Sequence, residues 1–178
     1  MKKIISIAIA LICSWAAFAE DAASWSSPSL KAIDFGIGIP VECYDLQAAG
    51  LNLHLGFDRS YPLNERLAVG FYLSAAGGFM GAFDQSVRYD NYHSVLQFNA
   101  GLLVEFGDLN KQPYILAVSP CTGFGLVDMD MVLPLEIRFG RMLSQHWYLT
   151  GGLTYGISLA NETRYWEPAI HIGYNFGH

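Results

Sequence analysis

The feature that most constrains this chain is a hydrophobic alternation with a period of two residues. Between Gly50 and Asp58, a large apolar side chain at every odd position alternates with a polar or small one. Successive side chains of a β-strand point to opposite faces of the sheet, so this pattern predicts a strand with one apolar face. The pattern recurs over 33–39, 67–73, 96–106, 114–118, 133–139, 147–159 and 170–176. The chain is therefore expected to be all-β, with eight strands.

The residues opposite the apolar faces indicate which side of the sheet meets water. A water-exposed face would carry many charges, whereas these faces carry Gly, Ser, Asn, Thr and Gln, with isolated charges at Asp34, Glu105, Glu136 and Arg138. Small and polar side chains suit the filled interior of a narrow barrel, and continuous apolar faces suit lipid. With 52% hydrophobic and 15% charged residues, the chain is also more apolar than a soluble surface requires. The sequence predicts an eight-stranded antiparallel up-and-down transmembrane β-barrel.

The links between the expected strands alternate in length. Three are short and rich in turn residues: 60–65, 107–113 and 143–146. The others are longer: 40–49, 79–92, 120–130 and 160–168. Short periplasmic turns that alternate with longer extracellular loops are typical of bacterial outer-membrane barrels.

The N-terminal residues have the three parts of a secretory signal peptide. Lys2 and Lys3 form a positive region, an apolar run extends from Ile4 to Trp15, and Ala17-Phe18-Ala19 is a small-x-small cleavage motif. A membrane anchor is the alternative, but the apolar run is short for a span. Cleavage after Ala19 would export the chain to the outer membrane. The expected organisation is a signal peptide (1–19), a short periplasmic segment (20–31) and the barrel (32–178).

Charge and cysteine content restrict the partners of the exported chain. Without Lys2 and Lys3, eight basic residues remain against sixteen acidic ones, a net charge of −8, which disfavours nucleic acid as a partner. Cys43 and Cys121 follow the first and fifth strands, on opposite sides of the barrel, where a wall-to-wall disulfide cannot form because the Cα atoms must approach within about 7 Å. Loops folded over the mouth would allow a disulfide; two unpaired thiols are the alternative. There is no CxxC spacing, so no metal site or cofactor is expected.

Two other folds deserve comparison with the barrel. Leu67 to Phe83 carries no charge and approaches the length of a membrane-spanning helix, but it contains four glycines and its first half alternates. A soluble lipocalin-like barrel would need charged outward faces, which these strands lack. Both alternatives are disfavoured.

The signal peptide, eight alternating strands, loop asymmetry and aromatic-rich last strand (Tyr174, Phe176) resemble those of the small eight-stranded outer-membrane β-barrels. This group contains the OmpA transmembrane domain, OmpX, OmpW and the opacity-type adhesins. The resemblance covers Ala32 to the C-terminus. It implies a monomer surrounded by outer-membrane lipid, inserted by the barrel-assembly machinery, with loops that are available to an extracellular ligand.

Several inward positions are candidate site residues. Glu105, Glu136 and Arg138 are expected to form a hydrogen-bonded cluster in the periplasmic half of the lumen, because a lone charge there would be costly. The alternative is that they are rim residues in contact with water. Four further polar residues are expected to line the lumen: His54, Gln97, Asn99 and His171.

Three functions remain open at this point. The resemblance includes lipid A-modifying enzymes, for which His93, Ser94 and Ser119 are the candidates, but adjacent strand residues face opposite sides, so His93 does not easily activate Ser94. An OmpW-like channel for small apolar solutes would use gaps beside inward glycines, although eight strands leave an interior that side chains fill. The favoured interpretation is a structural or surface-interaction protein, not an enzyme, that displays short acidic extracellular loops.

Overall fold

The computed structural model describes residues 30–42, 48–82, 92–120, 123–127, 130–159 and 164–177. Its strands are β1 (Lys31–Gly38), β2 (Val41–Glu42), β3 (Ala48–Asn64), β4 (Leu67–Ala82), β5 (Tyr92–Phe106), β6 (Tyr114–Pro120), β7 (Phe124–Val127), β8 (Asp130–Met142), β9 (Trp147–Ser158) and β10 (Arg164–Asn175). Among these residues, no helix is long and apolar enough to cross a membrane. The expected signal peptide (1–19), most of the expected periplasmic segment (20–29), Cys43 and Cys121 lie outside the described residues.

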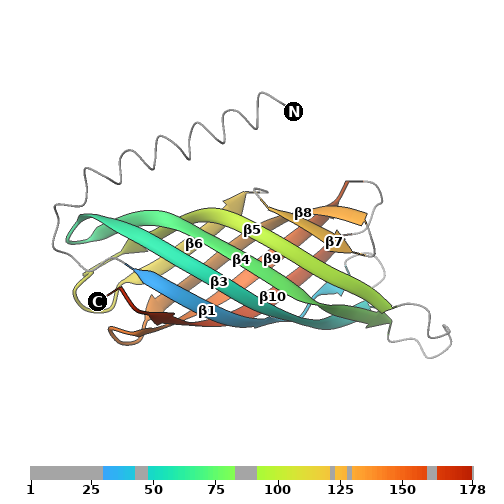
Figure 1. Ribbon diagram of the computed structural model, residues 1–178, viewed down its shortest axis with the longest axis horizontal. Helices are drawn as coiled ribbons and strands as arrows, with labels where there is room; N and C mark the ends of the chain where they lie inside the picture. The colour runs from blue at the N-terminus through green and yellow to red at the C-terminus, as the bar shows by residue number, and fades with distance from the viewer. Residues whose placement is uncertain are drawn as a thin grey trace, which may run out of the picture.

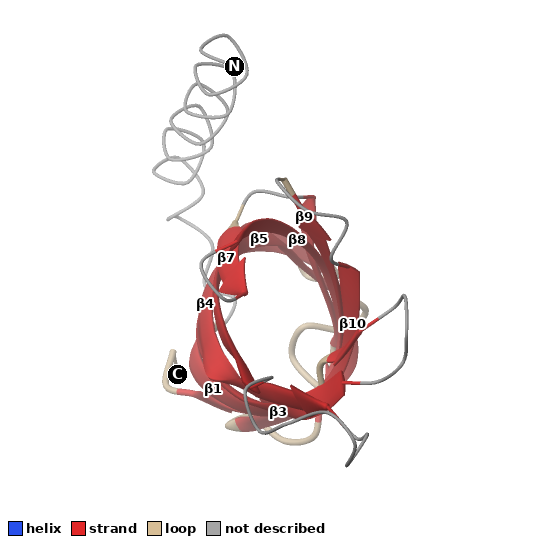
Figure 2. Cartoon of the chain, turned by 90° about the vertical axis from the view of Figure 1, so that its right-hand side faces the viewer, coloured by secondary structure: helices blue, strands red, loops and turns tan. Residues whose placement is uncertain are grey.

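The strands form one closed antiparallel barrel. β1 pairs with β10 on one side and with β3 on the other, so that Ile33 lies opposite both Tyr174 and Phe57. β2 continues the path of β1 between β10 and β3, and β7 continues the path of β6 between β5 and β8. The ten segments therefore make eight spans in up-and-down order, which Figure 2 shows as a ring and Figure 1 as a set of tilted strands. The predicted fold class is confirmed.

Each strand separates an apolar outer face from an inner face that is small or polar. In β10, exposed and buried side chains alternate along the whole strand, and in β1 the alternation begins after Lys31. The exposed positions are large and apolar, with 65% of Ile170 and 62% of Phe35 and Leu53 accessible. Exposing such side chains to water would cost about 25 cal/mol per Å², whereas lipid solvates them. The apolar face is thus the outward one.

The strands differ from their predicted bounds at several ends. β3 runs to Asn64, so the predicted turn at 60–65 shrinks to Glu65–Arg66. The predicted loop at 120–130 contains β7, and β4 extends to Ala82. These extensions were missed because Gly, Ala and Pro interrupt the alternation there, while strand pairing needs only the backbone.

The lumen is filled in three layers along the barrel axis. An apolar cluster lies near the turns that join β5 to β6 and β8 to β9, and its members are Leu30, Ala32, Tyr72, Leu103, Ile115, Ala117, Met142 and Tyr148. A second apolar cluster lies near the opposite strand ends and contains Met80, Val95, Val132 and Tyr165. Most of the buried polar and charged side chains occupy the level between them, whereas Ser60, Glu105 and Asn175 lie at the level of the first cluster.

Candidate functional site

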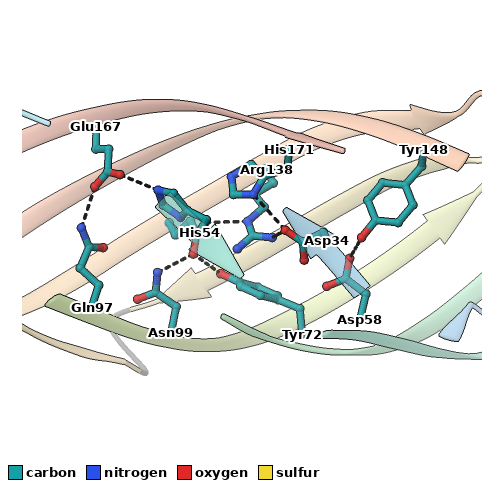
Figure 3. A network of polar contacts seen from close by, with 11 residues as sticks. Asp34, His54, Asp58, Tyr72, Gln97, Asn99, Arg138, Tyr148, Glu167 and His171 are labelled. Carbon is teal, nitrogen blue, oxygen red and sulfur yellow. Dashed lines mark hydrogen bonds and ion pairs between the residues drawn. The ribbon is translucent and has the colours of Figure 1, made fainter. Parts of the chain in front are cut away.

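Buried polar side chains from β1, β3, β4, β5, β8 and β10 meet in the middle of the lumen (Figure 3). The period-two geometry of the strands places them there, since every second residue points inward. Glu136 is 1% and Arg138 2% exposed, and Asp34, Glu167 and His171 are fully buried. Charged groups in such an environment require partners.

Arg138 is the centre of the first set of contacts. Its Nε donates to Oε1 of Glu136 at 2.6 Å, and its Nη1 donates to Oδ1 of Asp34 at 3.3 Å. The guanidinium also lies over the ring of Tyr72, 4.7 Å from the centroid. The other oxygen of Glu136 accepts from the Tyr72 hydroxyl at 3.1 Å and from Nδ2 of Asn99 at 2.6 Å. One cation therefore holds two carboxylates from β8 and β1, two strands that are separated in the barrel wall by β9 and β10.

Glu167 is the centre of the second set. Its Oε1 lies 2.6 Å from Nε2 of His54, and its Oε2 accepts from Nδ2 of Asn52 at 2.9 Å and from Nε2 of Gln97 at 2.6 Å. His171 links back to the first set through its Nδ1, 3.0 Å from Oδ1 of Asp34. The rings of His54 and His171 meet edge to face at a centroid distance of 5.0 Å.

The structure brings together most of the predicted lumen residues but not all of them. Glu136 and Arg138 are paired, and His54, Gln97, Asn99 and His171 all belong to the same network. Glu105 differs from the prediction, because its carboxylate accepts a hydrogen bond from Ser60 rather than from Arg138. It lies two residues along β5 from Leu103 of the apolar cluster. Among the described residues, no contact joins it to Arg138.

Sequence reasoning missed three acidic members of the lumen as site residues: Asp34, Asp58 and Glu167. Asp58 accepts a hydrogen bond from the hydroxyl of Tyr148, which belongs to the apolar layer. Glu167 fell in a predicted loop, although it has the same inward parity as His171 four residues later. Extending the alternation toward the N-terminal end of the last strand would have found it.

Three of the network residues form a group with the composition of a metal site. His54, Glu136 and His171 each offer one ligand atom, and these atoms all lie within 4.8 Å of one another. Two of the histidine nitrogens, Nδ1 of His54 and Nε2 of His171, have no hydrogen-bond partner among the described residues.

The two candidate catalytic serines lie on different faces of the barrel wall. Ser119 is completely buried inside the barrel, whereas Ser94 is exposed on the other face of its strand. The side chain of His93 lies outside the described residues. The candidate pairing of a serine with His93 is therefore not tested by the described residues.

No protein-family model and no curated protein matches this sequence. Among solved structures, the outer membrane enzyme PagL matches with a TM-score of 0.56 and 12% identity over 78% of this chain and 97% of that one. Neisserial surface protein A (NspA) matches with a TM-score of 0.52 and 12% identity over 82% of this chain and 97% of that one. At this identity the likeness concerns the fold. The chain has the architecture of the small eight-stranded outer-membrane β-barrels, which supports a place in a bacterial outer membrane.

Proposed function

We propose that this protein is a filled, non-conducting outer-membrane barrel with a structural or surface-interaction role, displaying short acidic extracellular loops. The observation that carries the proposal is the layered lumen, in which side chains close the barrel at three levels. A passage for solute would have to break the apolar layers at both ends and the ion-paired layer between them. Removing one partner of a buried ion pair costs about 3–5 kcal/mol, so such an opening is unfavourable.

A channel would need gaps beside the inward glycines, and neighbouring side chains fill that space. A Cβ atom at Gly36 would meet the ring of His171, and one at Gly38 would meet Glu167 and His54. These glycines let bulky polar side chains cross a narrow barrel, which supports a filled lumen over an OmpW-like passage.

Single-channel recording of the full chain in planar bilayers, together with uptake of a hydrophobic dye into proteoliposomes, tests the closed barrel. We expect neither discrete conductance steps nor dye flux, while a reconstituted porin gives the conductance steps. Reproducible openings or dye flux would overturn the proposal in favour of a channel. Lipid A from producing cells should keep its acyl chains; a chain lost or added there would favour an enzyme.

The surface role depends on an extracellular ligand that contacts the loops. Cells that produce the full chain should bind to host cells or immobilised matrix proteins more than cells that produce a variant with residues 84–90 replaced by a short Gly-Ser linker. Equal adhesion by both, with equal amounts of folded barrel, would leave a structural role in the envelope as the function.

A further inference from the structure

His54 and His171, both in the lumen, share a hydrogen-bonding arrangement that closure of the barrel does not require. Each has one ring nitrogen held by a carboxylate: His54 by Glu167 at 2.6 Å and His171 by Asp34 at 3.0 Å. The second nitrogen of each ring has no hydrogen-bond partner among the described residues, although both side chains are fully buried. An unpaired buried polar atom costs about 1–3 kcal/mol. Two such atoms in one chamber therefore favour a ligand between them.

The spacing of the three side chains fits a small ion. One ligand atom from each of His54, His171 and Glu136 lies within 4.8 Å of the other two. An ion at the centre of a triangle of that size would lie at most about 2.8 Å from each atom, against the 2.0–2.2 Å of zinc bound by His and Glu. The three side chains would have to move inward by less than about 1 Å, which is within the reach of small side-chain rotations.

The carboxylates that hydrogen-bond to the two histidines also favour metal binding. A metal-bound histidine usually donates its other N–H to a carboxylate, which fixes the tautomer and raises the basicity of the ligating nitrogen. Glu167 and Asp34 make this contact with His54 and His171. Glu167 is itself held by Asn52 and Gln97, so the support behind His54 is rigid.

The charges of the chamber are unbalanced without a further cation. Three buried carboxylates, those of Asp34, Glu136 and Glu167, face the one guanidinium of Arg138 in this network. Arg138 takes one oxygen of Glu136, but a carboxylate oxygen has two lone pairs and can also bind an ion. Buried carboxylates that outnumber their cation partners are costly at this depth, and one divalent cation held by the two imidazoles would offset their charge.

From these contacts we infer that the lumen binds one divalent transition-metal ion through His54, His171 and Glu136, and that Zn²⁺ is the best match. Two imidazoles and one carboxylate are a usual zinc ligand set, which leaves a fourth position for water. The ion would tie β3, β8 and β10 together across the barrel. The inference is independent of the surface role proposed above.

The test uses the full chain in detergent, stripped with a chelator and refolded with and without Zn²⁺ so that access to the lumen does not limit binding. We expect one Zn²⁺ per chain after gel filtration. His54→Gln and His171→Gln should each lower the affinity at least about 100-fold. His146→Gln, at the exposed turn after β8, is the matched control and should bind as the wild type does. Heat-modifiable gel migration checks that each variant is folded.

X-ray absorption at the zinc edge of the loaded wild-type protein gives a readout that needs no variant. Two imidazole ligands with oxygen completing the shell are expected. The inference would be overturned if the zinc had fewer than two histidine ligands. It would also be overturned if His146→Gln were the variant that abolished binding, or if the wild-type protein bound no stoichiometric zinc after refolding in Zn²⁺.

Discussion

At the scale of single residues, the lumen depends on one cation that serves several partners. Arg138 contacts Glu136, Asp34 and the ring of Tyr72, all of them buried. Such a buried pair need not make the barrel more stable than an apolar replacement of the whole set would, because desolvation offsets the attraction. Removing the cation alone is different, since it leaves two carboxylates without compensation.

Replacing Arg138 by Met should therefore destabilise the barrel by about 3–5 kcal/mol at neutral pH. The loss should shrink at acid pH, where Asp34 and Glu136 take up protons and the uncompensated charge disappears. Urea unfolding in lipid vesicles at both pH values measures the difference.

Arg141→Met is the matched control, because Arg141 lies three residues along the same strand but is exposed and stacks on Tyr114. It should shift the free energy of unfolding by less than about 1 kcal/mol at either pH. Equal unfolding midpoints for Arg138→Met and the wild type would mean that the ion-paired layer contributes nothing to stability.

At the scale of the strand, each element has to satisfy lipid on one face and a crowded lumen on the other. β3 shows both demands: Leu51, Leu53 and Leu55 are exposed, while Asn52 and His54 are buried in the network. A one-residue slip would exchange the two faces, so the alternation also fixes the register.

Depth in the membrane should decide the cost of a charge on the outer face. Leu53 lies in the middle of β3 and Leu63 at its end beside the turn, and both side chains are outward and exposed. Leu53→Arg should destabilise the barrel by about 2–4 kcal/mol and Leu63→Arg by about 0–1 kcal/mol. Unfolding in vesicles measures both, and equal costs would argue that this face does not lie in lipid.

Close strand pairing should make some glycines irreplaceable and others not. A Cβ atom at Gly70 of β4 would meet the backbone of Arg59 and Ser60 in β3, which cannot rotate away, whereas one at Gly151 of β9 would meet nothing within 4 Å. Gly70→Ala is expected to cost about 1–3 kcal/mol of unfolding free energy. Gly151→Ala should stay within about 0.5 kcal/mol of the wild type; a larger loss there than at Gly70 would contradict the pairing.

At the scale of the whole molecule, closure of the sheet is what makes the layered lumen possible. Pairing of β1 with β10 removes both sheet edges, so every strand has two neighbours and no edge faces lipid. The same closure brings β1, β8 and β10 around one chamber although they are far apart in the sequence (Figure 2).

The closed barrel should behave as a single unit. In detergent it should give a β-rich circular dichroism spectrum and migrate faster on a gel when unheated than when boiled, because the intact barrel stays compact in the cold sample. A helical spectrum, or a chain that stays monomeric without detergent, would contradict the membrane barrel.

The local pattern of the sequence determined the strands, their faces and the fold class. Alternation of apolar and small residues depends only on neighbouring positions, and it is strong in segments such as 51–57 and 170–176. It also placed His54, Gln97, Asn99, Glu136, Arg138 and His171 on the inner face.

Only the tertiary structure decided which inward residues meet. Partners across the lumen depend on strand tilt and register, which place Asp34 of β1 beside Arg138 of β8 and Glu167 of β10 beside His54 of β3. Glu105 has the same inward parity, yet its level along the axis gives it Ser60 as its partner. Distance along the barrel axis is set by how all the strands are sheared against one another, and no single segment of the sequence contains that information.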